Sequence, residues 1–85
     1  MSLAPSDHLL ITRHHDQPGT MGRIGMILGE ADVNISSMTL ARSTPRADAF
    51  MLLALDDEAP DRVLDQIRAD HAVIDAWQVR LGVDR

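Results

Sequence analysis

Residues 8–29, HLLITRHHDQPGTMGRIGMILG, place a strand, a turn and a helix in direct succession. Residues 8–14 are rich in apolar and β-branched side chains and stop at a Gln17-Pro18-Gly19 turn, a pattern typical of a β-strand. Apolar side chains then recur at steps of three and four residues, which predicts an amphipathic helix. These side chains are Met21, Ile24, Leu28 and Ala31. Pro18 suits the first turn of this helix because its φ is already helical.

The next part of the chain predicts a β-hairpin. Residues 35–42 and 47–55 are two strand-like segments, and the second of them is strongly apolar. The Ser43-Thr44-Pro45-Arg46 segment between them has residues that favour a turn. We therefore expect the two strands to pair.

A second helix and a last strand complete the pattern. Pro60 opens the helix, and its side chains separate into two faces. Val63, Leu64 and Ile67 are expected to face inward, and Arg62, Asp65 and Gln66 outward. In the last strand, alternation is expected to put Val73, Trp77, Val79 and Leu81 on one side. The order βαββαβ predicts an α+β, ferredoxin-like fold: a four-stranded antiparallel sheet with two helices on one face.

The chain has 85 residues and no cysteine, and we expect a single domain over 1–85 with its core at about 8–82. A domain of this size buries only roughly 60% of the surface of its unfolded chain, so self-association would add stability. Open sheet edges also invite pairing with another chain, and the predicted first and third strands carry little charge. A dimer is therefore plausible from size and pattern.

Charge and composition exclude two classes of partner. The formal net charge is −5, with one Trp, one Phe and no Tyr, whereas nucleic-acid surfaces need basic stripes and stacking rings. The longest apolar run, residues 49–55, is far too short to span a bilayer, and the N-terminus lacks signal-peptide features. We expect no nucleic-acid or membrane partner and a cytoplasmic location.

The two adjacent histidines do not predict a metal site. Neighbours on a strand point to opposite faces, so His14 and His15 cannot easily chelate one ion. Gly19, Gly22 and Gly25 are spaced G-x-x-G-x-x-G, which differs from the G-x-G-x-x-G fingerprint of dinucleotide-binding proteins. We therefore expect no metal and no dinucleotide in this stretch.

Gly22, Gly25 and Gly29 lie on nearly one stripe of the predicted helix. Missing side chains let a helix approach a sheet or another helix closely, so packing is the simplest role for these glycines. Ser36 and Ser37 are the available hydroxyl nucleophiles, and no activating arrangement surrounds them in the sequence. No catalytic residue is predicted, and we expect no enzymatic activity from this chain alone.

The loop before the first helix suits a zwitterion. Asp16 supplies an anion for an ammonium group, and the free backbone N–H groups of the helix start, Gly19 to Met21, suit a carboxylate. Both charges of an amino acid would be matched. The alternative is that Asp16 or Gln17 only caps the helix and that His14 is an ordinary strand residue.

Residues 9–82 resemble an ACT domain, a small-molecule-binding regulatory module, in particular the C-terminal regulatory domain of D-3-phosphoglycerate dehydrogenase. The matching positions are His14, Asp16, Pro18, Gly19, Gly22, Ile24, Gly25 and Leu28, then Val33-Asn34-Ile35, Met38, Arg42 and Asp56, with Trp77 and Val79 near the end. The resemblance implies that the chain is either a domain excised from a larger enzyme or a free-standing relative of such a domain. The larger enzyme uses NAD to oxidise 3-phosphoglycerate in the first step of serine synthesis. The resemblance implies no cofactor in the domain itself.

The resemblance also implies a ligand and a site. The effector would be an amino acid, in particular L-serine, bound by His14, Asp16 and the Pro18-Gly19 turn of one chain and by Asn34 of its neighbour. Some relatives carry Asn in place of Asp16. In the family, two domains pair through an edge strand and the first helix, which would make Gly22, Gly25 and Gly29 interface residues of a homodimer.

Two other functions remain open. The regulatory domain of L-serine dehydratase has a similar pattern, and its amino acid is again serine. A module that dimerises a parent enzyme and binds no ligand belongs to a different class. A binding module would keep space between Asp16 and Asn34 at the dimer interface, whereas a purely structural module would fill it with side chains.

Overall fold

The computed structural model describes residues 8–42 and 48–81. Its elements are β1 (His8–His15), α1 (Thr20–Glu30), β2 (Ile35–Arg42), β3 (Asp48–Leu55), α2 (Asp61–Arg68) and β4 (Val73–Arg80). The predicted βαββαβ order is confirmed, while the predicted turn at 43–46 and the predicted start of the third strand at Ala47 lie outside the described residues. Within these ranges, no helix combines the length and the apolar character needed to cross a membrane.

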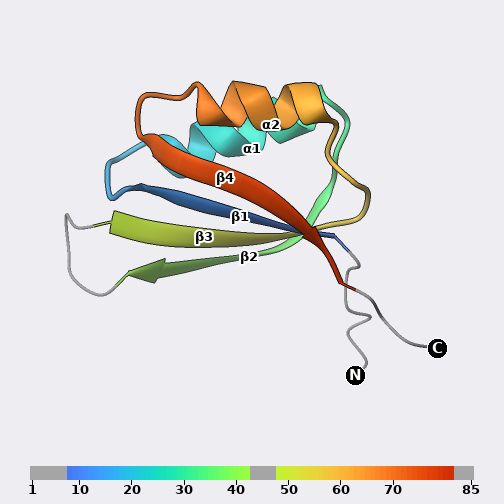
Figure 1. The fold of residues 1–85 in the computed structure, drawn as a ribbon, viewed down its shortest axis with the longest axis horizontal. Coiled ribbons are helices and arrows are strands. Elements are labelled where there is room, and N and C mark those ends of the chain that lie inside the picture. The colour runs from blue at the N-terminus through green and yellow to red at the C-terminus, as the bar shows by residue number, and fades with distance from the viewer. Residues whose placement is uncertain (1–7, 43–47, 82–85) are drawn as a thin grey trace.

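The four strands form one antiparallel sheet in the order β2-β3-β1-β4. Figure 1 shows both helices on the same face of this sheet, which confirms the ferredoxin-like arrangement. The weakly charged strands β1 and β3 are the two central strands, so their composition reflects burial in the sheet and says nothing about its edges. The edges are β2 and β4.

The core lies between the sheet and the helices. On β3, every second side chain is fully buried, because alternate residues of a strand face the same side. The core side chains are Leu10, Ile24, Leu28, Val33, Met51, Leu53, Leu55, Ala59, Val63, Leu64, Ile67 and Ala76. In α2 the predicted faces are confirmed: the three apolar side chains are buried, and Arg62, Asp65 and Gln66 are exposed.

A register shift in β4 changes which residues share a face. Thr12 pairs with Ala76, but His14 pairs with Val73, so one extra residue is inserted in β4 between these pairs. Val73 therefore faces the helices and packs against the core. The prediction that Val73 shares a side with Trp77 and Val79 is wrong, because simple alternation does not hold across a bulge.

The turn between β1 and α1 depends on Gly19. This residue is the N-cap of α1 and has a φ of 88°, a left-handed conformation that glycine adopts without strain. Pro18 precedes the cap and so lies outside the first helical turn, contrary to the prediction. A side chain at Gly19 would also meet Arg23, whose Nη1 lies 2.9 Å from the place of an added Cβ.

Candidate functional site

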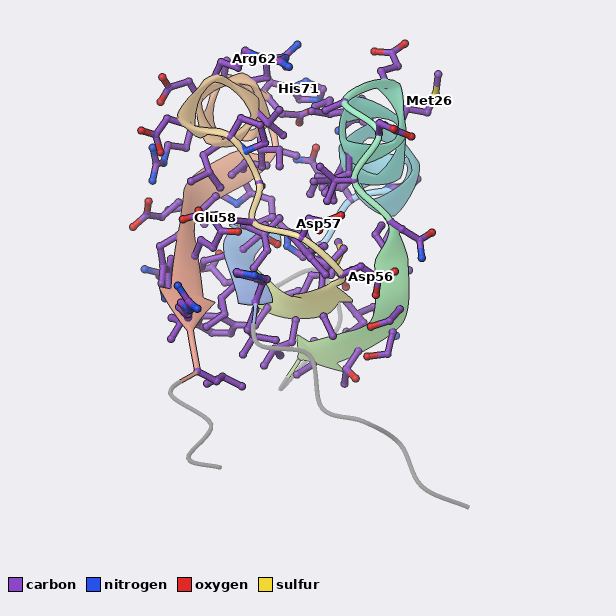
Figure 2. The ribbon with its side chains drawn as sticks, turned by 90° about the vertical axis from the view of Figure 1, so that its right-hand side faces the viewer. Met26, Asp56, Asp57, Glu58, Arg62 and His71 are labelled. Carbon is purple, nitrogen blue, oxygen red and sulfur yellow. The ribbon has the colours of Figure 1, made fainter. Side chains whose placement is uncertain are left out.

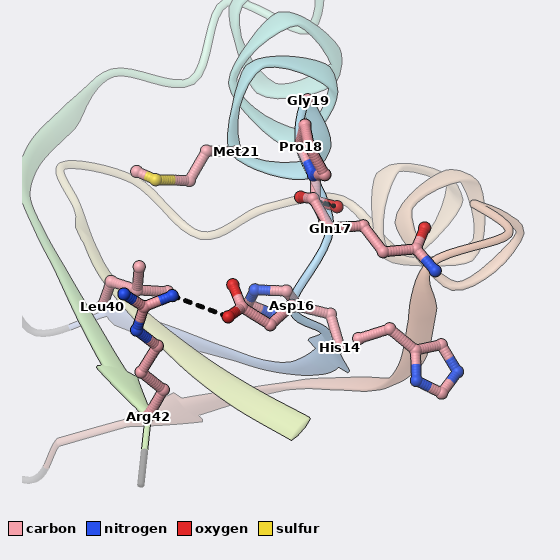
Figure 3. Close-up of a pocket in the computed structure, with 10 residues that line it drawn as sticks. His14, Asp16, Gln17, Pro18, Gly19, Met21, Leu40 and Arg42 are labelled. Carbon is pink, nitrogen blue, oxygen red and sulfur yellow. Dashed lines mark hydrogen bonds and ion pairs between the residues drawn. The ribbon is translucent and has the colours of Figure 1, made fainter. Parts of the chain in front are cut away.

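An open pocket of about 880 Å³ lies where β1 ends and α1 begins. Its walls come from the end of β1, the connection to α1, the first turn of α1 and the end of β2 (Figure 3). The lining residues are His14, His15, Asp16, Gln17, Pro18, Gly19, Thr20, Met21, Leu40 and Arg42. The structure thus brings together four of the five predicted ligand residues, His14, Asp16, Pro18 and Gly19.

An ion pair joins two sides of the pocket. Arg42 Nη1 donates a hydrogen bond to Asp16 Oδ2 over 2.6 Å (Figure 3). The register places Ala49 of β3 between His14 of β1 and Arg42 of β2. Because Ala49 is small, the Arg42 side chain can extend across β3 toward Asp16. In the sequence, Arg42 was noted only as one of the positions that resemble the ACT family. No local pattern predicts that it pairs with Asp16, which lies 26 positions away.

The two histidines of the pocket differ in environment. His14 is buried beside Thr12, with 3.4 Å between His14 Nδ1 and Thr12 Oγ1, whereas His15 is exposed. Burial lowers the pKa of His14, although the Asp16 carboxylate acts to raise it, so the imidazole is neutral near pH 7. The prediction that these neighbours face opposite sides is confirmed. Among the described residues, no group of three or more His, Asp or Glu side chains is arranged to hold a metal ion.

The start of α1 presents backbone donors to the pocket. The first N–H groups of a helix have no partner within the helix, and both Thr20 and Met21 line the pocket. The N-cap of α1 is Gly19, which has no side chain with which to cap the helix. The alternative in which Asp16 or Gln17 only caps the helix stays a prediction. A helix start of this kind favours an anion such as a carboxylate.

A chain of hydrogen bonds supports the turn. Arg23 donates to Asp70 through Nε over 2.6 Å and through Nη2 over 3.1 Å. Arg23 Nη2 also lies 3.4 Å from Thr20 Oγ1, which donates to the Gln17 carbonyl over 3.2 Å. Asp70 further accepts from the Ala72 N–H over 2.9 Å. The segment before β4 therefore holds the loop that forms the pocket, a link that sequence reasoning missed.

The Arg23–Asp70 pair predicts an acid-sensitive contribution to stability. The Arg23 hydrogen bonds lower the pKa of Asp70 to about 2, so the pair stabilises the fold above the unfolded pKa of about 4 and is lost as pH falls toward 2. We expect Asp70→Asn to reduce the free energy of unfolding by about 1 kcal/mol at pH 7, since Arg23 is partly exposed to solvent. Urea unfolding at several pH values measures this. If the difference in unfolding free energy between the wild-type chain and Asp70→Asn stays constant down to pH 2, the Arg23–Asp70 pair is not the source of the acid sensitivity.

Asn34, the fifth predicted ligand residue, lies elsewhere in the chain. It precedes β2 and is therefore at the opposite end of that strand from Leu40 and Arg42. Its side-chain Nδ2 donates to Asp56 Oδ2 over 2.7 Å, and its backbone carbonyl accepts from the Asp56 backbone N–H over 3.0 Å. Within one chain, the structure does not bring Asn34 to the pocket.

The glycine stripe of α1 faces away from the core. An added Cβ at Gly22, Gly25 or Gly29 would have no described atom within 4 Å, apart from the helix's own backbone and chain neighbours. These glycines therefore make no close contact with another described element of the same chain, and the prediction that they allow close packing against another molecule stays a prediction. Their surface remains available to another molecule.

The ACT domain family model matches residues 8–72. The chain is 42% identical to D-3-phosphoglycerate dehydrogenase of Synechocystis sp. over 81 residues, which cover 95% of the chain and 15% of that protein. It is 40% identical to the Methanocaldococcus jannaschii enzyme over 80% of the chain and 13% of that protein. The Archaeoglobus fulgidus enzyme is 35% identical over 95% of the chain and 16% of its own length. The chain thus corresponds to a small part of these relatives.

Two solved structures share the fold. The ACT domain of a GTP pyrophosphokinase from Chlorobium tepidum has a TM-score of 0.66 and 16% identity, over 85% of this chain and 95% of that one. A homoserine dehydrogenase from Thiobacillus denitrificans has a TM-score of 0.63 and 22% identity, over 87% of this chain and 17% of that one. At these identities the likeness concerns the fold alone. The family match and the dehydrogenase relatives show that the chain belongs to the ACT domain family.

Proposed function

We propose that this ACT domain binds an amino acid, L-serine in particular, and regulates a D-3-phosphoglycerate dehydrogenase of which it is a part. The supporting observation is the pocket itself, which is lined both by Asp16 and by the first residues of α1, Thr20 and Met21. An ammonium group would bind Asp16, and a carboxylate would accept hydrogen bonds from the first N–H groups of the helix. Oxidation with NAD is assigned to the rest of the parent enzyme, and no cofactor is assigned to this domain.

The proposal includes a homodimer formed through β2 and α1. β2 is an edge strand, so one row of its backbone groups does not pair within the sheet. Apolar side chains are exposed on both elements: Met21 and Met26 of α1 at 41% and 66%, and Met38 and Leu40 of β2 at 41% and 42%. Figure 2 shows Met26 on the side of α1 away from α2. A second copy would cover this surface and extend the sheet.

Dimerisation would also explain the position of Asn34. If two β2 strands pair antiparallel, the start of one lies opposite the end of the other. Asn34 of the partner subunit would then approach Arg42 and the pocket. Its amide both donates and accepts, so it could serve the ligand hydroxyl or carboxylate.

Thermal shift against the twenty standard amino acids tests the ligand. A ligand that binds only the folded chain adds about 2.7 kcal/mol of stability at a hundred times its dissociation constant. We expect the largest shift for serine or another small amino acid. A chain that dimerises but is stabilised by no amino acid would instead be a dimerisation module.

A regulatory domain of L-serine dehydratase is the second candidate, because it too would take serine. The dehydrogenase relatives favour the first candidate. Assaying the full-length parent separates them: serine-dependent inhibition of phosphoglycerate oxidation supports the first, and serine deamination by the parent supports the second.

Gly25→Leu is expected to weaken the proposed dimer. No described atom beyond its own helix lies within 4 Å of an added Cβ at Gly25, so the isolated subunit can accommodate the side chain. At a close interface between α1 helices, the same side chain would overpack the contact by about 1–3 kcal/mol. Light scattering at micromolar concentration measures the change. Gln66→Leu on the exposed face of α2 is the control and should leave the mass unchanged, whereas an unaltered Gly25→Leu dimer would place the interface elsewhere.

A further inference from the structure

We propose that Arg42 and Asp16 act together to make this pocket selective for zwitterions, with Arg42 binding the ligand carboxylate. The inference deepens the proposed amino-acid function and rests on it. It assigns a role to Arg42, which lies at the end of the edge strand β2 and lines the same pocket.

The geometry supports this role. The Asp16 side chain is only 18% exposed, and its Oδ2 lies 2.6 Å from Arg42 Nη1, so each charge has an opposite charge beside it. The Arg42 side chain is 48% exposed and extends over the pocket toward Asp16 (Figure 3). Its planar guanidinium carries five N–H donors, so it can keep one bond to Asp16 and give others to a carboxylate.

The charge balance of the pocket explains the selectivity. The Asp16 and Arg42 charges cancel, and the His14 imidazole is neutral near pH 7 because burial lowers its pKa. A zwitterion adds a positive group beside Asp16 and a negative group beside Arg42. The summed charge of Asp16, Arg42, His14 and the ligand therefore stays at zero. A simple amine or a simple acid would match one member of the pair and be repelled by the other.

The surroundings strengthen this discrimination. Met21 and Leu40 line the pocket with apolar surface, and each is about two-fifths exposed. A bound amino acid would exclude water between these side chains and the ion pair, and charges interact more strongly where water is excluded. An unmatched charge would therefore bind poorly.

Three related compounds test the inference by calorimetry: L-serine, ethanolamine, which lacks the carboxylate, and 3-hydroxypropionate, which lacks the amine. We expect the wild-type chain to bind serine and to bind each of the other two at least about tenfold more weakly. Arg42→Gln should weaken serine binding about tenfold and shift the preference toward ethanolamine. Asp16→Asn should shift the preference toward 3-hydroxypropionate.

Two further variants separate this role from a general loss of structure. Arg42→Lys keeps the charge and should retain the preference for serine over ethanolamine. Arg13→Gln is the matched control, because Arg13 pairs with Asp48 over the same distance of 2.6 Å and its side chain is also 48% exposed. Neither Arg13 nor Asp48 lines the pocket, so this variant should bind serine as the wild-type chain does. Circular dichroism checks that each variant is folded.

The possible failures are distinct. If the wild-type chain binds serine and Arg42→Gln binds it equally well with unchanged preference, this inference is wrong and the proposed function stands. If the wild-type chain binds no amino acid in the thermal-shift series, the proposed function is wrong and this inference fails with it.

Discussion

Asp16→Ala is expected to weaken L-serine binding by about ten- to a hundredfold, because a charge-assisted hydrogen bond contributes roughly 1.5–3 kcal/mol. Asp16 is the carboxylate that lines the pocket, and its side chain is mostly buried there. Its removal would leave the ligand ammonium without a counter-charge and beside the Arg42 guanidinium. Asn34→Ala should weaken binding by a smaller factor, since its amide is uncharged. Isothermal calorimetry measures both.

The control for this substitution is Asp65→Ala. Asp65 also pairs with an arginine, Arg68, over 3.2 Å, but it lies on the exposed face of α2. Serine affinity should not change in this variant. If Asp16→Ala binds serine as well as the wild-type chain does, the role of Asp16 is limited to its pairing with Arg42, and the proposed site is wrong.

Ile67→Ala is expected to lower the free energy of unfolding by about 2–5 kcal/mol, the range for truncating a fully buried aliphatic side chain. Ile67 is 0% exposed and belongs to the core. With Val63 and Leu64, it forms the buried face of α2. Small domains have a total stability of only about 5–15 kcal/mol, so this loss is a large fraction. Urea unfolding followed by circular dichroism measures it.

Gln66→Ala is the matched control, since Gln66 is the preceding residue of the same helix and is exposed. It should change stability by less than about 0.5 kcal/mol. Serine binding to folded Ile67→Ala should be retained, because Ile67 does not line the pocket. If Ile67→Ala lowers the free energy of unfolding by less than about 1 kcal/mol, the core tolerates a cavity beneath α2.

Local patterns in the sequence were enough to predict the elements and their order. Alternation predicted the last strand, which is β4 (Val73–Arg80), and three- and four-residue spacing predicted the inward face of α2 at Val63, Leu64 and Ile67. Both periodicities follow from the backbone geometry of a strand or helix, which neighbouring residues determine. The same local reasoning placed Asp16, Pro18 and Gly19 together at the junction of the first strand and the first helix. It failed where the backbone departs from regularity, as at the β4 bulge and the glycine cap of α1.

The contacts that shape the pocket were decided by the tertiary structure. Arg42 reaches Asp16 because the strand order puts only β3 between β2 and β1, and because the register places the small Ala49 in that gap. Arg23 holds Asp70, 47 positions away, because the segment before β4 folds back beside the start of α1. Neither pairing leaves a local signal, since the spacing between two residues in the chain does not fix strand order or register. The sequence by itself determined which elements form and which residues lie in the loop, and the packing of these elements determined which charges meet there.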